Sequence, residues 1–411
     1  MPKRLLLCLI VLLLVCTSCA GQPEAVNIMC YDYQEGMFRL IYNEETAHGH
    51  TLAPVAFHSL EMEDYTDYVE WHDAIFTGLL TGRDDMDIFL LNSTDDRAYK
   101  ALKDHYYVDL SQDTELMEYF DAMYPQIREW CIFGSEIFGF PISVSHPMGI
   151  LASEKRIQSV GYTMEDIMTM DGLVGFCHAW REHNPTPPTS GTLYTRYYCD
   201  NYLMTHYDRD TGELDLGTPA FRTLMDQCRE YMMDQDLPFD HDLSTYTVEM
   251  DKPLAFYTDD PFVVRENHIP GSYPLIEGEA PGTMRYAEVT YLVINPASKN
   301  KEQAFEYMRL AAEAVKYHSW GDMLYRDKEF YKSFLLTKGR VTRDNCYSEE
   351  QFEIAGRFLE DAYVGYGFPG FSDVSRVLYR YIYGRDQTLD ETIAEAQDLL
   401  DTIRQEQYIG E

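Results

Sequence analysis

Two carboxylates and an aromatic ring follow directly on an apolar segment in the second half of the chain. The residues are Asp259, Asp260 and Phe262, and the apolar segment before them covers residues 253–257. Carboxylates accept hydrogen bonds from hydroxyl groups, and aromatic rings stack on the C–H faces of sugars. Paired carboxylates also attract cations. This turn therefore predicts recognition of a hydroxyl-rich or a cationic molecule, and the alternative is a turn whose side chains meet only solvent.

A second cluster of aromatic side chains follows a proline-rich loop at residues 184–188. Its members are Tyr194, Tyr197 and Tyr198. Packing into a hydrophobic core accounts for at least one ring of such a cluster, and rings at the surface are suited to stacking on a ligand. We predict that Tyr194 and Tyr197 contact the ligand.

Polar side chains also stand where two predicted strands end. Tyr33 follows the apolar residues 26–31, and Asn92 and Ser93 close the apolar run 87–92. In open α/β sheets, ligands bind beyond the carboxyl ends of the strands. We therefore predict that these three residues contact a ligand, the alternative being that they only cap the strand ends.

Sequence patterns for metal binding and catalysis are weak. His178 and His183 are five residues apart, and H-E-x-x-H is not present in the sequence. The segment 208–212 is similar to a calcium loop, but its glycine falls at loop position 5 and Pro219 stands where a glutamate is needed. With 69 Asp and Glu residues, a pair of acids at glycosidase spacing arises by chance. We predict no catalytic residue, no metal site, no cofactor and no enzymatic activity.

The charge of the chain narrows the choice of partners. Its 411 residues include 33 Lys and Arg against 69 Asp and Glu, which gives a formal net charge of −36. Such a surface repels phosphate backbones and anionic lipid headgroups. We therefore expect a globular protein that binds no nucleic acid and does not dock on a membrane by charge.

The N-terminal residues read as a targeting segment. Lys3 and Arg4 precede an apolar run at residues 5–15, which is too short to span a bilayer. Small residues before Cys19 resemble a bacterial lipobox, in which the cysteine thiol is diacylated. We expect export and lipid anchoring through Cys19 to the outer face of the bacterial cell membrane; the alternative is an ordinary signal peptide cut near Ala20.

The elements that position these residues alternate between strand and helix patterns. Apolar runs at 26–31, 52–57, 87–92, 253–257 and 289–294 predict strands. Apolar residues at helical spacing predict helices over 69–80, 221–233, 301–315 and 388–403, the last opened by a Thr388–Glu391 capping box. The order at the start of the chain predicts an α/β domain with an open parallel sheet. The cysteines beyond Cys19 are scattered in apolar surroundings, which favours buried thiols.

Several passages resemble the extracellular solute-binding lipoproteins of ABC importers, a group that includes maltose-binding and other sugar-binding proteins. They lie at residues 79–89, 101–110, 137–141, 149–154, 254–262, 292–305 and 388–403, and so cover most of the chain. The step at 292–305 matches well and includes Ser298, Lys299 and Ala304. Ala152, Ser153, Asp260 and Phe262 depart from the family's pattern, which affects the identity of the ligand more than the fold.

The resemblance implies an α/β fold of the two-lobed periplasmic-binding-protein type (type II) with a hinged interlobe cleft. We expect a signal peptide at 1–19, a tether at 20–25, a first lobe at 26–140 and 255–316, and a second, mostly helical lobe at 141–254 and 317–411. The implied function is a monomeric receptor that binds a solute, such as a sugar or oligosaccharide, and delivers it to ABC permease subunits. Three alternatives stay open: an exported glycan-acting enzyme, a sensing or adhesion lipoprotein, and a receptor for a cationic ligand such as a polyamine or basic peptide.

Overall fold

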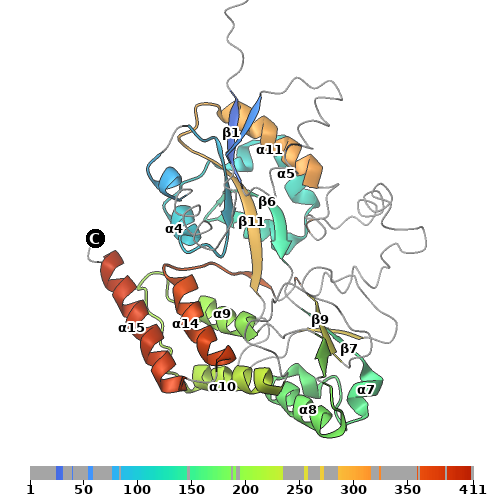
Figure 1. The fold of residues 1–411 in the computed structure, drawn as a ribbon. Helices are drawn as coiled ribbons and strands as arrows, with labels where there is room; N and C mark the ends of the chain where they lie inside the picture. Colours follow the sequence, from blue (N-terminus) through green and yellow to red (C-terminus); the bar gives the residue numbers. More distant parts are fainter. Residues whose placement is uncertain are drawn as a thin grey trace, which may run out of the picture.

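The computed structural model (Figure 1) describes residues 25–30, 39, 54–58, 76–82, 85–145, 149–186, 188–190, 195–234, 254–257, 269–272, 286–315, 324, 359, 362–384 and 387–408. These residues form two bodies. The upper one in Figure 1 is built on a long-stranded sheet, and the lower one is mainly helical.

The upper body contains a six-stranded sheet in the order β12-β11-β3-β1-β2, with β6 also paired to β11. Strands β1, β2 and β3 are parallel to one another, whereas β11 is antiparallel to both β3 and β6. The strands are β1 (Val26–Met29), β2 (Val55–His58), β3 (Ile88–Asn92), β6 (Phe140–Ser145), β11 (Tyr286–Ile294) and β12 (Tyr363–Val364).

The open parallel sheet expected from the sequence is therefore wrong in one respect, because the sheet is mixed. The strand β11 inserts beside β3 in the antiparallel direction and pairs Thr290 with Asn92 and Ile294 with Ile88. Some 190 residues separate the two strands along the chain, so local alternation of strand and helix patterns does not reveal their pairing. Central placement explains why all five residues of β3 are buried.

Helices cover this sheet and complete the first core. They are α4 (Ala98–Lys103), α5 (Thr114–Ala122), α6 (Pro125–Trp130) and α11 (Lys301–Val315), with the short hairpin β4 (Ile132–Phe133) and β5 (Glu136–Ile137) beside them. On α11 the predicted buried face is confirmed at Ala304, Met308, Ala311 and Ala312. The helix predicted before Gly82 is confirmed over residues 76–80, and Gly82 has the left-handed φ of 64° that ends it.

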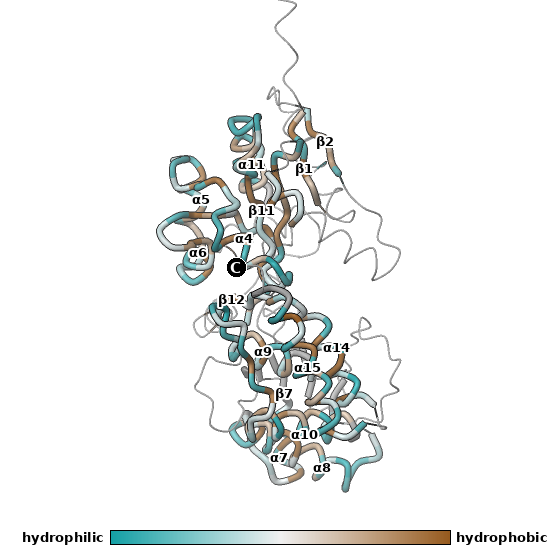
Figure 2. The backbone as a smooth tube through the Cα atoms, turned by 90° about the vertical axis from the view of Figure 1, so that its left-hand side faces the viewer, coloured by the Kyte–Doolittle hydropathy of each residue, from teal (hydrophilic) through white to brown (hydrophobic). Residues whose placement is uncertain are grey.

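The lower body has a second core formed mostly by helices. These are α7 (Glu154–Gln158), α8 (Met170–His183), α9 (Thr195–His206), α10 (Pro219–Asp234), α14 (Phe371–Tyr383) and α15 (Leu389–Tyr408). A small sheet in the order β10-β7-β9-β8 joins them; its strands are β7 (Gly149–Ala152), β8 (Thr189–Ser190), β9 (Leu254–Tyr257) and β10 (Ile269–Ser272). Figure 2 shows apolar backbone segments inside each body, among them α14 in the lower one.

Local sequence signals in the lower body are confirmed. The predicted apolar face of α10 is buried at Phe221, Leu224, Met225 and Cys228. The predicted capping box at the start of α15 forms reciprocally: the Thr388 N–H donates to Glu391 Oε2 at 3.2 Å, and the Glu391 N–H donates to Thr388 Oγ1 at 3.3 Å.

The cysteines also follow the prediction of burial. The five described cysteines, Cys30, Cys131, Cys177, Cys199 and Cys228, are all buried. Burial raises the pKa of the Cys131 thiol well above its usual value, which makes this thiol unreactive.

One short segment, residues 363–370, passes from the first core to the second. It starts as β12 beside β11 and then delivers Phe368 to the second core. Two glycines on it lie very close to neighbouring atoms: a Cβ on Gly367 would meet the Thr94 carbonyl oxygen at 2.1 Å, and one on Gly365 would meet Met204 Sδ at 2.6 Å. At Gly367 the neighbouring atoms belong to the backbone, so only glycine allows this approach there. We refer to residues 363–370 as the crossing segment.

Candidate functional site

The predicted site residue Asn92 lies at the carboxyl end of β3 with its side chain engaged inside the protein. Its Nδ2 donates to Glu288 Oε1 at 2.6 Å. Its Oδ1 accepts from the N–H and the hydroxyl of Thr94, each at 2.9 Å. Because both ends of the amide are used, Asn92 orients Glu288 and closes the turn after β3.

Glu288 is a functional candidate that the sequence analysis missed. It lies on β11, is half-buried, and is brought to Asn92 from 196 residues away. Burial raises the pKa of its carboxyl, and the nearby Asp95 raises it further, while the hydrogen bond from Asn92 acts in the opposite direction. An acid within an otherwise apolar strand pattern was the available signal. Such a held carboxylate can accept hydrogen bonds from hydroxyl groups.

Ser93, which was predicted as a site residue together with Asn92, is fully buried and forms hydrogen bonds to two neighbouring segments. Its N–H donates to the Val289 carbonyl at 2.9 Å, and its Oγ accepts from the Val289 N–H at 3.0 Å. Its carbonyl accepts from the Gly367 N–H at 3.1 Å. Ser93 thus joins β3, β11 and the crossing segment. We refer to Asn92, Ser93, Thr94, Asp95 and Glu288 as the β3-end cluster.

The predicted ligand contacts in the two aromatic clusters follow, in the sequence, two neighbouring strands of the second sheet. Strands β8 and β9 are parallel, with Thr189 beside Leu254 and Ser190 beside Ala255. Their carboxyl ends therefore point the same way, and β8 ends four residues before Tyr194 while β9 ends two residues before Asp259. The two predicted clusters follow strands that leave the sheet at a common edge. We refer to this edge as the β8–β9 edge.

The β8–β9 edge is linked by a short stretch of chain to the β3-end cluster. Ser145 at the end of β6 pairs with Glu288, and Gly149 at the start of β7 pairs with Tyr257. Four peptide units connect Ser145 and Gly149, so their Cα atoms are at most about 14 Å apart. Figure 1 shows the end of β6 and the start of β11 on the side of the upper body that faces the sheet of β7 and β9. A ligand of a few sugar rings is long enough to bridge such a separation.

Arg209 and several tyrosines lie beside the crossing segment. The Arg209 Nη2 donates to the carbonyls of Met204 and Tyr366 at 3.3 and 2.8 Å, and its guanidinium carbon lies 5.3 Å from the centre of the Tyr99 ring on α4. Burial lowers the pKa of this guanidinium. Next to it, Asp210 forms an ion pair with Lys103 at 3.0 Å. These contacts attach the turn after α9 to α4 and serve to hold the two bodies together.

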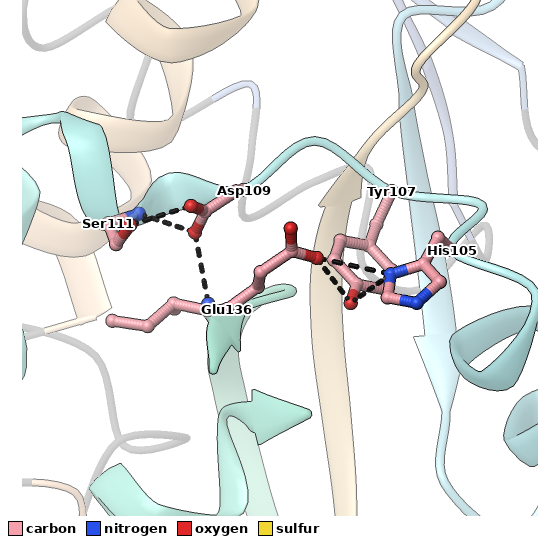
Figure 3. Close-up of polar contacts among 6 residues, drawn as sticks. His105, Tyr107, Asp109, Ser111 and Glu136 are labelled. Atoms are coloured by element: carbon pink, nitrogen blue, oxygen red, sulfur yellow. Dashed lines mark hydrogen bonds and ion pairs between the residues drawn. The ribbon is translucent and has the colours of Figure 1, made fainter. Parts of the chain in front are cut away.

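A further polar network ties the end of α4 to the β4–β5 hairpin (Figure 3). The Tyr107 hydroxyl donates to Glu136 Oε2 at 2.8 Å, and His105 Nδ1 lies 3.1 Å from the same oxygen. His105 has a left-handed φ of 57°, which turns the chain sharply after α4. Burial raises the pKa of the Tyr107 hydroxyl, and its hydrogen bond to Glu136 raises the pKa further.

Asp109, in the same view, fastens the other side of the hairpin. Its carboxylate accepts from the Ser111 N–H and hydroxyl and from the Ile137 N–H. Partial burial acts to raise its pKa, but these hydrogen bonds outweigh it and lower the pKa overall. The Asp in this passage of the resemblance is thus a structural residue that caps a turn and anchors β5.

The remaining predicted site residues are not all described. Tyr33, Tyr194, Asp259, Asp260, Phe262 and the lipidation candidate Cys19 lie outside the described residues, and of Tyr197 only the backbone, in α9, is described. The structure brings Asn92 and Ser93 together with Glu288. The other contacts stay predictions.

Within the described residues, no three His, Cys, Asp or Glu side chains are grouped to hold a metal ion. Likewise, none of the helices in the described part of the chain is both long and apolar enough to cross a membrane.

Comparison with solved structures gives a likeness in fold. The chain is similar to a crystal structure described as a sugar transporter from Rhizobium etli in an open conformation. The TM-score is 0.57 at 13% sequence identity, and the match covers 92% of this chain and 99% of that chain. At this identity, the likeness concerns the fold alone. No protein-family model matches the sequence, and no curated protein matches it.

This comparison corrects the expected fold class. We expected a two-lobed periplasmic-binding-protein-like fold of type II with a hinged interlobe cleft, and that expectation is wrong: a solved structure with a similar fold is described as a sugar transporter and not as a periplasmic binding protein. The expectation depended on short passages with substitutions at key positions and on a parallel sheet that is in fact mixed. The described residues support a mixed α/β fold with two hydrophobic cores. The proposed division into residue ranges stays a prediction.

Proposed function

We propose that this chain takes part in sugar transport as an exported receptor that binds a carbohydrate and delivers it to an ABC permease. The observation that carries the proposal is the likeness in fold, over nearly the whole length of both chains, to a protein described as a sugar transporter. The short resemblances to solute-binding lipoproteins support the same role. The net charge of −36 supports a small solute over a nucleic acid as the partner.

The proposed ligand site combines the β8–β9 edge with Glu288. In this proposal Phe262, Tyr194 and Tyr197 stack on sugar rings, while Asp259 and Asp260 accept hydrogen bonds from hydroxyl groups. Tyr33 is a further stacking contact. Glu288 supplies a carboxylate that is oriented by hydrogen bonds from Asn92 and Thr94. Aromatic faces together with planar polar groups are the combination that sugars require.

A screen of saccharides tests the proposal on the full chain in mild detergent. A ligand present at about 100 times its dissociation constant adds roughly 2.7 kcal/mol to the free energy of unfolding. We expect a rise in melting temperature with a mono- or oligosaccharide, and loss of that rise in Asp260→Ala and in Phe262→Ala. Matched controls are Asp398→Ala on the exposed side of α15 and Ile132→Ala at an exposed apolar position; both should respond as the unaltered chain does.

Each other result of the screen points to a different function. A rise only with polyamines or basic peptides would replace the sugar by a cationic ligand, for which the paired Asp259 and Asp260 are also suited. Release of sugar products would indicate a glycan-acting enzyme. No response to any compound would contradict the receptor and favour a sensing or adhesion lipoprotein.

We further propose that Cys19 anchors the chain to the outer face of the bacterial cell membrane. A diacylated cysteine supplies two acyl chains, which suffice for stable attachment. We expect Cys19→Ala to abolish incorporation of radiolabelled palmitate and to release the protein from the membrane fraction. Cys16→Ala, three residues earlier, is the matched control and should stay anchored. Labelling that survives Cys19→Ala would contradict the anchor.

A further inference from the structure

Polar side chains from three neighbouring strands gather on one face of the six-stranded sheet. Thr290 of β11 pairs with Asn92 of β3 on one side and with Ser143 of β6 on the other. Directly paired residues of antiparallel strands place their side chains on the same face. Glu288, two residues before Thr290, lies on this face as well, in agreement with the hydrogen bond that it accepts from Asn92. We refer to Asn92, Ser143, Glu288 and Thr290 as the β11 polar patch.

A β-bulge in β6 brings Ser143 into this patch. Pro141 pairs with Tyr291 of β11. Ser143 pairs with the adjacent residue of β11, Thr290, so Ile142 is the extra residue of the bulge. Because strand residues alternate between the two faces, Ser143 would lie on the opposite face without this extra residue. Bulges of this kind occur next to functional sites, where they redirect a side chain.

The hydroxyl groups of Thr290 and Ser143 are half-buried and have no hydrogen-bond partner within the described part of the chain. The opposite face of the same strands is different, since Val289, Val144 and Tyr291 are buried there in the first core. A half-buried hydroxyl group takes its hydrogen bonds from water or from a ligand when the protein supplies none. The patch therefore offers two hydroxyl groups that a ligand can use.

The composition of the patch favours the hydroxyl groups of a neutral ligand. Thr290 and Ser143 can each donate and accept a hydrogen bond, and the ionised carboxylate of Glu288 accepts. The Cα atoms of paired residues are about 5 Å apart, so two neighbouring hydroxyl groups of one sugar ring can reach both side chains. A polyamine would gain less here, because Glu288 is the one charged group of the patch.

We propose that Thr290 and Ser143 are specificity-determining residues that bind two neighbouring hydroxyl groups of a neutral sugar beside the carboxylate of Glu288. This inference rests on the proposed function and assigns one end of its ligand to the β11 polar patch. The four peptide units from Ser145 to Gly149 keep the β8–β9 edge within about 14 Å of the end of β6. The ligand is then an oligosaccharide with one ring at the patch and the others at that edge.

Calorimetric titration of the full chain in mild detergent tests the proposal. The probe is whichever mono-, di- or trisaccharide of glucose, galactose, mannose or xylose gives the largest thermal shift. We expect Thr290→Val, which replaces the hydroxyl by a methyl group, and Ser143→Ala each to weaken binding about 3- to 10-fold. Thr290→Ser keeps the hydroxyl and should bind as the unaltered chain does. Thr223→Val, at an exposed position of α10, is the matched control and should also bind normally.

Each contrary result has a distinct meaning. Unchanged affinity in both Thr290→Val and Ser143→Ala would overturn the subsite and leave the proposed function standing. A loss in Thr290→Ser as large as that in Thr290→Val would also overturn it, because the hydroxyl would not be the cause. If the unaltered chain binds none of these saccharides, the subsite and the proposed function are both contradicted. Equal melting temperatures without saccharide show that the variants are folded.

Analogues of the probe that each lack one hydroxyl group identify the sugar group in contact with Thr290. For one analogue, we expect the unaltered chain to lose as much affinity as Thr290→Val loses with the parent sugar. The variant should lose little more with that analogue, since the two changes remove the same hydrogen bond. Additive losses for every analogue would contradict a direct contact.

Discussion

The β3-end cluster and the β8–β9 edge were both predicted as binding sites, but they differ in the hydrogen-bond partners and the composition of their polar residues. At the β3-end cluster, the side chains of Asn92 and Ser93 are bonded to protein groups from β11, and Ser93 also binds the crossing segment through its carbonyl. At the β8–β9 edge, two strands end together just before segments rich in tyrosine and carboxylate. The first region joins parts of the molecule, and the second has the composition of a binding surface.

This difference teaches that a polar residue at a strand end is not by itself a binding residue. Asn92 fulfils the sequence rule for a site, but its amide has two partners within the protein. The rule that ligands bind beyond the carboxyl ends of strands nevertheless leads to Glu288, because Asn92 donates a hydrogen bond to its carboxylate. The carboxylate that we propose as a ligand contact, Glu288, comes from a distant strand.

The largest effect on stability is expected from Gly367→Ala. This substitution disturbs the contact between the crossing segment and the β3-end cluster without changing the β8–β9 edge. The new Cβ would lie 2.1 Å from the Thr94 backbone oxygen, so the crossing segment must move away from β3. Such overpacking costs about 3 kcal/mol or more. Chemical denaturation measures the loss. Gly161→Ala is the control, since its φ of 88° is strained but its Cβ meets nothing within 4 Å; an equal cost in both would refute the close approach.

A smaller loss is expected from Asn92→Ala, which leaves the Glu288 carboxylate without its amide donor. A hydrogen bond to a charged group is worth about 1.5–3 kcal/mol, and the hydrogen bond from Thr94 to Glu288 remains in the variant. The pKa of Glu288 is already raised, so stability tied to its protonation is lost as the pH rises, and the cost of the variant should be larger near neutral pH than at about pH 4. Denaturant titrations at both pH values check this. Adding Glu288→Gln should recover part of the loss, and a pH-independent cost would argue against the pairing.

Local features of the fold could be predicted because their causes are close together in the sequence. The apolar run at 87–92 became a fully buried strand, and Thr388 and Glu391 formed the capping box that their spacing indicated. The antiparallel entry of β11 could not be predicted, because strand direction depends on a partner almost 200 residues away. The contacts of Glu288 and Arg209 could not be predicted for the same reason, because each joins segments that are far apart in the sequence.

Hydrogen exchange with and without a saccharide tests the central claim most directly, which is that the β8–β9 edge binds the ligand and the β3-end cluster supports it. The unaltered chain would be measured with the saccharide that gives the largest thermal shift. We predict strong added protection in peptides covering residues 191–198 and 258–263, and only a small change at 92–95, which are already hydrogen-bonded within the protein. Protection confined to residues 92–95, or no change in either region, would contradict the claim.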